Sequence, residues 1–193
     1  MKEIVKKYFE EIVKNLSGIA ATDSENKKSD FNQAIADAID MINKCSVSGK
    51  KIMFIGNGAS AAISSHMATD FWKNGGIKAI AFNDSSLLTC ISNDYGYQYV
   101  FEKPVEMFAD KGDILIAISS SGRSENIIKG ARMALYKGCK LITLSGFEEN
   151  NTLRSLGCIN FYVPSSLYGL IEIIHQAICH SIIDLIIETK KLN

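Results

Sequence analysis

KIMFIGNGAS, residues 51–60, is the stretch of sequence that decides the fold of this chain. It begins with a continuous apolar run typical of a buried strand, and it ends in a turn of small residues after which a helical pattern starts. DILIAISSSGRS, residues 113–124, repeats this arrangement with a turn that is rich in serine. The start of a helix offers unpaired backbone N–H groups and the positive end of the helix dipole to an anion. The two turns together therefore predict a phosphate-binding cleft.

The two turns do not match the fingerprints of nucleotide-binding loops. The first turn lacks the later glycines of G-x-G-x-x-G, and the second has no Gly-Lys-Ser/Thr. A sugar phosphate is therefore the favoured ligand. The alternative is that the serines only cap a helix. Capping would explain Ser121 or Ser124, but not four serines and a glycine in six positions.

Five short apolar runs indicate an α/β fold. They are continuously apolar, as expected of strands that are covered on both faces in a parallel sheet. The predicted strands are 51–55, 79–82, 114–118, 141–144 and 160–163. Helical patterns lie between them, and crossovers between parallel strands are right-handed. The chain therefore predicts a doubly wound five-stranded parallel sheet flanked by helices, with N-terminal helices and a long apolar C-terminal helix.

The chain before residue 49 differs in character from the rest. Residues 1–48 predict an N-terminal helical segment that packs on the core or on a neighbouring subunit, with helices over 1–16 and 30–45. The polar stretch between these helices, residues 22–29, could be mobile. Residues 49–193 are predicted to form the sugar-phosphate domain.

The composition argues against several classes of protein. The chain has 193 residues and a formal net charge of zero, without a long block of lysine and arginine, so nothing in it predicts a nucleic-acid partner. The first residues are charged and lack the apolar core of a secretory signal, which predicts a cytoplasmic protein. The five cysteines are scattered without C-x-x-C spacing. We therefore expect reduced cysteines in the core and no zinc ribbon.

The last predicted helix, residues 168–188, is the most apolar part of the chain and approaches the length that crosses a bilayer. Polar side chains interrupt it, each of them unfavourable at membrane depth: Glu172, His175, Gln176, His180 and Asp184. We therefore expect this helix to lie between the sheet and another subunit, with no membrane partner. A buried carboxylate and a buried imidazole need partners, which makes Glu172 and His180 candidate site residues. For His175 and Cys179, packing is favoured over metal binding.

A second polar pair lies on the helix after the first turn. His66 and Asp70 are four residues apart and face the same way, so they can share a metal ion, although local hydrogen bonding alone would also explain them. If Glu172 and His180 enter the same cleft, the four residues make a plausible site for zinc or another divalent metal. Eight residues on a helix span about 12 Å, so one ion could reach both only if the side chains lean together or a neighbouring subunit supplies one of them.

Four motifs occur in an order that resembles a known family. They are residues 56–60, Asn93-Asp94-Tyr95-Gly96, residues 118–124 and residues 172–180. In combination they resemble the bacterial phosphoheptose isomerases, which belong to the SIS (sugar isomerase) domain proteins, over about residues 50–188. The resemblance implies a homotetramer with active sites near subunit interfaces. It implies aldose-ketose interconversion of sedoheptulose 7-phosphate and D-glycero-D-manno-heptose 7-phosphate through an enediol, for surface polysaccharide.

The resemblance also implies roles for individual residues. The acid/base pair would be Asp70 and His180. The metal ligands would be His66, Asp70, Glu172 and His180, with zinc as the expected ion. The substrate contacts would be Asn57, Gly58, Ala59, Ser60, Asp70, Asn93, Asp94, Ser119, Ser120, Ser121, Ser124 and Glu172.

The chain departs from the family pattern at several of these positions. Asp70 stands where the family usually has glutamate, and Glu172 stands where it usually has glutamine. The usual Gly-Arg-Tyr after the first motif is replaced by Lys73-Asn74-Gly75. Two alternatives therefore stay open: a non-catalytic SIS adaptor, such as a tetramer that assists a replication initiator, and a sugar-phosphate-sensing SIS regulator. Against the regulator, we expect no DNA-binding domain within these 193 residues, and an adaptor would have little use for the His and carboxylate set.

Overall fold

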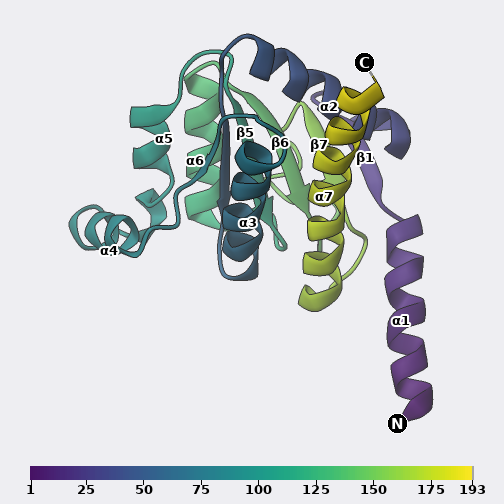
Figure 1. Ribbon diagram of the computed structural model, residues 1–193. Helices are drawn as coiled ribbons and strands as arrows, with labels where there is room; N and C mark the ends of the chain where they lie inside the picture. Colours follow the sequence, from purple (N-terminus) through teal and green to yellow (C-terminus); the bar gives the residue numbers. More distant parts are fainter. Residues whose placement is uncertain (193) are drawn as a thin grey trace.

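The computed structural model describes residues 1–192, and its centre is one seven-stranded sheet (Figure 1). The strands run in the order β2-β1-β7-β6-β5-β3-β4. Strands β3 to β7 pair parallel with one another. Their bounds are Ile52–Gly56 for β3, Ala79–Ala81 for β4, Ile114–Ser119 for β5, Lys140–Ser145 for β6 and Ile159–Tyr162 for β7. These five strands confirm the five predicted from apolar runs.

The N-terminal segment adds an antiparallel hairpin to this sheet, which the sequence did not predict. Residues 22–29, expected as a polar and mobile connection, contribute to β1 (Ala20–Asp23) and β2 (Lys28–Ser29). Strand β1 pairs antiparallel with β7, so it covers an edge that would otherwise leave backbone groups unpaired. The side-chain amide of Asn160 in β7 donates to the carbonyls of Thr22 and Asp23. The prediction failed because these short strands carry no apolar run.

Helices cover both faces of the sheet (Figure 1). Alternate side chains of β3 point to opposite faces: Ile52 and Phe54 join one buried cluster, and Met53 and Ile55 join the other. The first cluster includes α2 (Phe31–Val47), α3 (Ala59–Lys73) and α7 (Tyr168–Leu192). The second includes α5 (Glu102–Phe108) and α6 (Glu125–Tyr136), with α4 (Ser85–Asp94) packed against it. The 3-10 turn η1 (Tyr97–Tyr99) joins α4 to α5. Strands β3, β5, β6 and β7 are therefore buried on both faces, as their apolar sequences require, whereas the edge strand β4 is only partly buried, with Ile80 41% exposed.

The strand order creates a switch point beside β3. The chain crosses from β3 to β4 on one side and then returns past β3 to β5 on the other. In open α/β sheets, ligands bind outside the carboxyl ends of the strands at such a point. The glycine turn after β3 and the serine turn after β5 both lie at this edge.

Helix α7 combines a buried face with an apolar composition. By length and composition alone it could cross a membrane, but half of its most apolar window is buried inside the molecule. Ile171, Ile174 and Ile178 lie in the core, with 2% or less of their surface exposed. It thus packs as a core helix, as predicted.

Helix α1 (Lys2–Ser17) has little contact with the rest of the chain. It extends away from the body of the molecule (Figure 1), and Asn15 is the buried residue in it. Its apolar side chains are exposed: Phe9 by 60%, Val13 by 63% and Ile4 by 66%.

Candidate functional site

A cleft of about 250 Å³ lies between the two turns at the switch point. It is lined by the following residues: Asn57, Gly58, Ala59, Ser60, Ile118, Ser119, Ser120, Ser121, Ser124, Tyr168 and Glu172. Eight of these are the predicted turn residues, so the fold brings both turns into one cavity. Residues from the turn after β3 and the start of α3, from β5 and the turn after it, and from α7 line this cavity, although they are far apart in the sequence.

The first turn brings backbone close to the cleft. Gly56 ends β3, and a Cβ atom at this position would overlap the backbone of Ser60. Gly58 precedes α3 with a φ of 54° and a ψ of −123°, a conformation that favours glycine. No side chain caps the start of α3, so its end is open to an external acceptor.

The second turn holds its serines through short local bonds. The backbone N–H of Gly122 donates to Oγ of Ser119 at 3.2 Å, and the hydroxyls of Ser119 and Ser124 lie 3.4 Å apart. Ser124 occupies the N-cap position of α6, but its hydroxyl makes no capping bond. Helix capping therefore does not explain the serines, and the start of α6 is also open to an anion.

Gly122 fits the second turn for two reasons. Its φ of 61° lies in the left-handed region, and an added Cβ atom would overlap the side chain of Asn151. The Asn151 amide donates to Oγ of Ser145 at 3.1 Å, and the N–H of Leu153 donates to the carbonyl of Gly122 at 2.9 Å. The loop after β6 thus supports the serine turn from behind.

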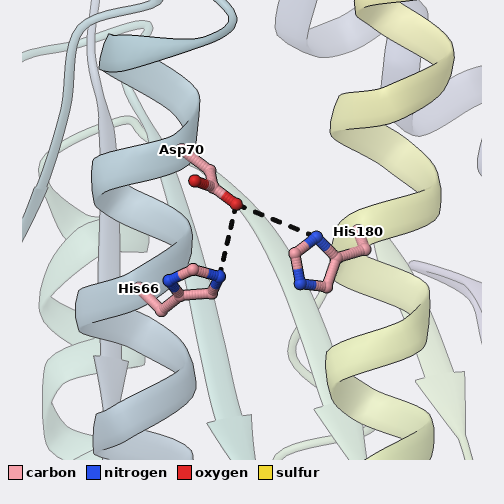
Figure 2. A group of neighbouring side chains, drawn as sticks. All are labelled: His66, Asp70 and His180. Carbon is pink, nitrogen blue, oxygen red and sulfur yellow. Dashed lines mark ion pairs between the residues drawn. The ribbon is translucent and has the colours of Figure 1, made fainter.

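Three titratable side chains meet between α3 and α7 (Figure 2). Oδ2 of Asp70 lies 3.4 Å from Nε2 of His66 and 3.8 Å from Nδ1 of His180. The two imidazole rings are 5.4 Å apart, and the potential ligand atoms of all three residues lie within 4.8 Å of one another. Asn74 donates to the second oxygen of Asp70 at 3.1 Å, which orients the carboxylate.

This three-residue group has the chemistry of a divalent metal site. Ligand atoms held about 2 Å from a tetrahedral ion lie roughly 3.3–3.5 Å from each other, close to the 3.4 and 3.8 Å that separate Asp70 from the two imidazoles. Two imidazoles and one carboxylate suit zinc and would leave a fourth position for a substrate oxygen. The residues present therefore fit the ion that the sequence predicts.

Glu172 lies outside this group. It lines the cleft, whereas the three-residue group that the described residues form contains His66, Asp70 and His180. Glu172 precedes His180 by two helical turns, about 12 Å along α7. Gln176 lies between them on the same helix and donates to the sulfur of Met67. Within one chain, the structure gives Glu172 a place in the cleft rather than among the metal ligands.

Comparison with known proteins now identifies the family. The sequence pattern of the SIS domain matches residues 7–146. A phosphoheptose isomerase from Helicobacter hepaticus is 38% identical over 159 residues, which cover 79% of this chain and 81% of that protein. The chain belongs to the phosphoheptose isomerase family of SIS-domain proteins. A phosphoheptose isomerase from Yersinia pestis is 37% identical over 93% of this chain and 96% of that protein.

Solved structures of the same family have the same fold. A phosphoheptose isomerase from Francisella tularensis matches with a TM-score of 0.84 and 28% identity, over 96% of this chain and 97% of that one. The enzyme from Neisseria gonorrhoeae matches with a TM-score of 0.82 and 29% identity, over 96% and 98%. The family resemblance, the isomerase class and the SIS fold are therefore confirmed.

Two residues that the phosphoheptose isomerase pattern implies as substrate contacts lie elsewhere. Asn93 and Asp94 end α4, are exposed, and do not line the cleft. The amide of Asn93 donates to Asp94 at 2.9 Å, and α4 lies at the periphery of the molecule (Figure 1). A single chain does not bring this pair to the serine turn.

Three residues near the cleft were missed from the sequence. Asn126, in the first turn of α6, is buried and forms a reciprocal amide pair with Asn57, at 2.8 and 2.9 Å. The hydroxyl of Tyr97 also donates to the Asn57 side chain, at 3.1 Å. Tyr168 lines the cleft at the start of α7. The available sequence signal for Asn126 was its position as a polar residue just after the serine turn. Nothing in the neighbouring sequence indicated Tyr97 or Tyr168.

His175 and Cys179 pack in the core, as expected. His175 is fully buried and its Nε2 lies 3.2 Å from the carbonyl of Ser145, to which it donates as a neutral imidazole. Burial lowers the pKa of His175 to about 4, against the opposing effect of that hydrogen bond. Burial raises the pKa of Cys179 to about 12. Neither residue belongs to the metal-type group that the described chain forms.

Proposed function

We propose that this protein is the phosphoheptose isomerase that interconverts sedoheptulose 7-phosphate and D-glycero-D-manno-heptose 7-phosphate, for surface polysaccharide. One observation carries the proposal: the serine cleft and the group of His66, Asp70 and His180 lie along the same pair of helices, α3 and α7. A seven-carbon ketose phosphate has its phosphate at one end and its carbonyl at the other. Such a substrate needs an anion site and a proton-transfer site that are separated along one groove.

The cleft would hold the phosphate. The serine hydroxyls and the open starts of α3 and α6 supply hydrogen-bond donors and positive dipole ends. The Asn57 and Asn126 pair fixes one wall of this cleft. Binding there contributes orientation, since it fixes the position of the distant carbonyl without touching it.

Asp70 and His180 would move the protons. Aldose-ketose exchange removes a proton from C1 or C2 and adds one to the other carbon, through an enediol. At the same time the carbonyl oxygen gains a proton and the neighbouring hydroxyl oxygen loses one. A carboxylate and an imidazole 3.8 Å apart can divide these two tasks. Asp70, with 18% of its side chain exposed, is the more shielded of the two and suits the carbon-bound proton, and His180, with 38% exposed, suits the oxygen.

His66, Asp70 and His180 would hold a divalent metal ion, and zinc is the ion that we expect there. When bound, it would supply polarisation of the substrate carbonyl. Glu172 would then act as a sugar contact in the cleft.

The same proposal includes a homotetramer in the cytoplasm, without nucleic-acid or membrane partners. The exposed apolar face of α1 supports the oligomer, because Phe9, Val13 and Ile4 would be covered by another copy. Ile173, 47% exposed on α7, adds to this surface. A neighbouring copy would also offer a partner for Asn93 and Asp94.

The deciding experiment is incubation of the purified protein with sedoheptulose 7-phosphate, with and without a chelator, and analysis of the products by NMR. Formation of the heptose 7-phosphate supports the proposal. A correctly assembled, metal-loaded tetramer that forms no product would contradict it and favour a non-catalytic SIS adaptor.

A further inference from the structure

A second polar cavity shares no lining residue with the cleft between the two turns, which we call the sugar cleft. Its volume is about 350 Å³, within the range of small-molecule sites. One wall comes from the β1–β2 hairpin and the other from the loop after β6. The lining residues are Thr22, Asn26, Lys28, Glu149, Asn150, Asn151, Arg154 and Ser155.

Arg154 is the buried cation of this cavity. Its side chain is 7% exposed, and its guanidinium carbon lies 4.6 Å from the ring centre of Tyr162. Nη1 of Arg154 donates to the carbonyl of Glu149 at 3.0 Å and lies 3.3 Å from the carboxylate of Glu149, which is itself 68% exposed. Within residues 1–192, Nε and Nη2 make no hydrogen bond. A buried guanidinium with unused donors is suited to a forked contact with an anion.

The rest of the cavity adds one more cation and several unpaired polar groups. Lys28 is exposed at the rim and forms no ion pair with a described residue. The side chains of Asn26 and Asn150 make no hydrogen bonds within the described part of the chain. The hydroxyl of Thr22 is buried, and among residues 1–192 it has no partner. Lys28 and Arg154 against Glu149 leave the cavity with net positive charge.

We propose that this cavity binds a phosphorylated polyol, separately from the sugar cleft. The phosphate would lie between Arg154 and Lys28, because a guanidinium fork and an ammonium group favour a phosphomonoester over a neutral ligand. The amides of Asn26 and Asn150 and the hydroxyl of Ser155 would contact the hydroxyl groups of the polyol. No exposed aromatic ring lines the cavity for stacking of a base, so a sugar phosphate is favoured over a nucleotide.

The test uses the full-length protein with the sugar cleft blocked by Ser121→Glu. Ribose 5-phosphate, inorganic phosphate, ribose and AMP are titrated by calorimetry. We expect one equivalent of ribose 5-phosphate per chain, weaker binding of inorganic phosphate and AMP, and no binding of ribose. Absence of ribose 5-phosphate binding would overturn the proposal, and so would equally tight binding of ribose or of AMP.

Charge variants in the same background locate the site. Lys28→Glu should weaken ribose 5-phosphate binding about tenfold or more, because a charge-assisted contact becomes repulsive. Lys27→Glu is the matched control, since Lys27 is the preceding residue of the hairpin and does not line the cavity. Arg154→Gln should abolish binding in a protein with native circular dichroism. Equal losses for the two lysine variants, or unchanged binding by folded Arg154→Gln, would contradict the assignment.

Discussion

Oδ2 of Asp70 lies 3.8 Å from Nδ1 of His180, although Asp70 belongs to α3, which follows the first parallel strand, and His180 belongs to α7, the last helix of the chain. His66 brings a second imidazole to the same carboxylate oxygen (Figure 2). This contact makes Asp70 and His180 the residues whose loss should stop the reaction while leaving the fold intact.

Asp70→Asn and His180→Ala should each lower turnover of sedoheptulose 7-phosphate by at least about a hundredfold, because each removes a proton-transfer group. Product formation followed by NMR measures this loss, and light scattering checks the oligomer. Asp184→Asn is the control, because Asp184 is an exposed acid one turn beyond His180. Near-normal turnover by both variants would show that other residues move the protons.

His66→Ala should reduce the metal content of the purified protein. The reason is that His66 supplies one of three convergent ligand atoms. Glu172→Gln should retain the metal, because Glu172 lines the cleft and not the three-residue group. Elemental analysis of the two variants after dialysis measures the difference. Metal loss from Glu172→Gln equal to that from His66→Ala would place Glu172 among the ligands.

The same Glu172→Gln variant should bind sugar phosphate more tightly. Glu172 places a negative charge in the cleft predicted to hold a phosphate, and removing one such charge at about 6 Å in water should lower KM about threefold. Steady-state kinetics at low and high salt measure the change, which should shrink as salt screens the charge. Glu188→Gln, an exposed change on the same helix, is the control. A raised KM would instead show that the contact of Glu172 with the sugar needs a carboxylate, which an amide cannot replace.

Gly122→Ala should lower the free energy of unfolding by about 3 kcal/mol. The left-handed φ costs about 1 kcal/mol for alanine, and overlap with Asn151 adds the rest. Gly49→Ala is the matched control, because Gly49 has a φ of 72° but no atom near its Cβ position. Urea denaturation at one protein concentration compares the two variants. Equal losses would mean that the Asn151 contact relaxes without cost.

Stability should fall in mild acid because His175 is buried as a neutral imidazole. Its pKa is about 4 in the folded chain and 6.5 in its ordinary state, so the unfolded chain binds the extra proton first. The share of the free energy of unfolding that depends on neutral His175 is fully present above pH 6.5. It is lost as the pH falls from 6.5 to 4, to a total of about 3 kcal/mol. Urea denaturation of the wild type and His175→Gln at pH 7.5 and 4.5 measures it. The variant should lose less stability on acidification, with His66→Gln as the exposed control.

Phe9→Glu should dissociate the oligomer. The change places a charge on the exposed apolar face of α1, which we propose another copy covers. Lys7→Glu is the control, because Lys7 lies on the polar side of the same helix. Light scattering at several concentrations measures the subunit number. A Phe9→Glu protein with an unchanged subunit number would exclude this face from the interface.

The parallel sheet and the meeting of the two turns in one cleft were predictable from the sequence, but the hairpin and the contacts of α7 were not. The apolar runs of β3 and β5 are local signals, and so are the turns at residues 56–60 and 119–124. The β1–β2 hairpin, in contrast, is held by pairing with β7, a partner at the other end of the chain. Spacing alone likewise gave no reason to prefer His180 over Glu172 as the partner of His66.

The sequence by itself determined where strands end, which turns offer backbone N–H groups to an anion, and that His66 and Asp70 share a helix face. These features depend on residues close together in the chain. Tertiary structure alone decided that His180 meets Asp70 while Glu172 lines the cleft with the serine turn, and that Arg154 and Lys28 line one cavity. The physical reason is that such contacts depend on how far one packed helix or loop is displaced along another, which the folding of the whole core sets.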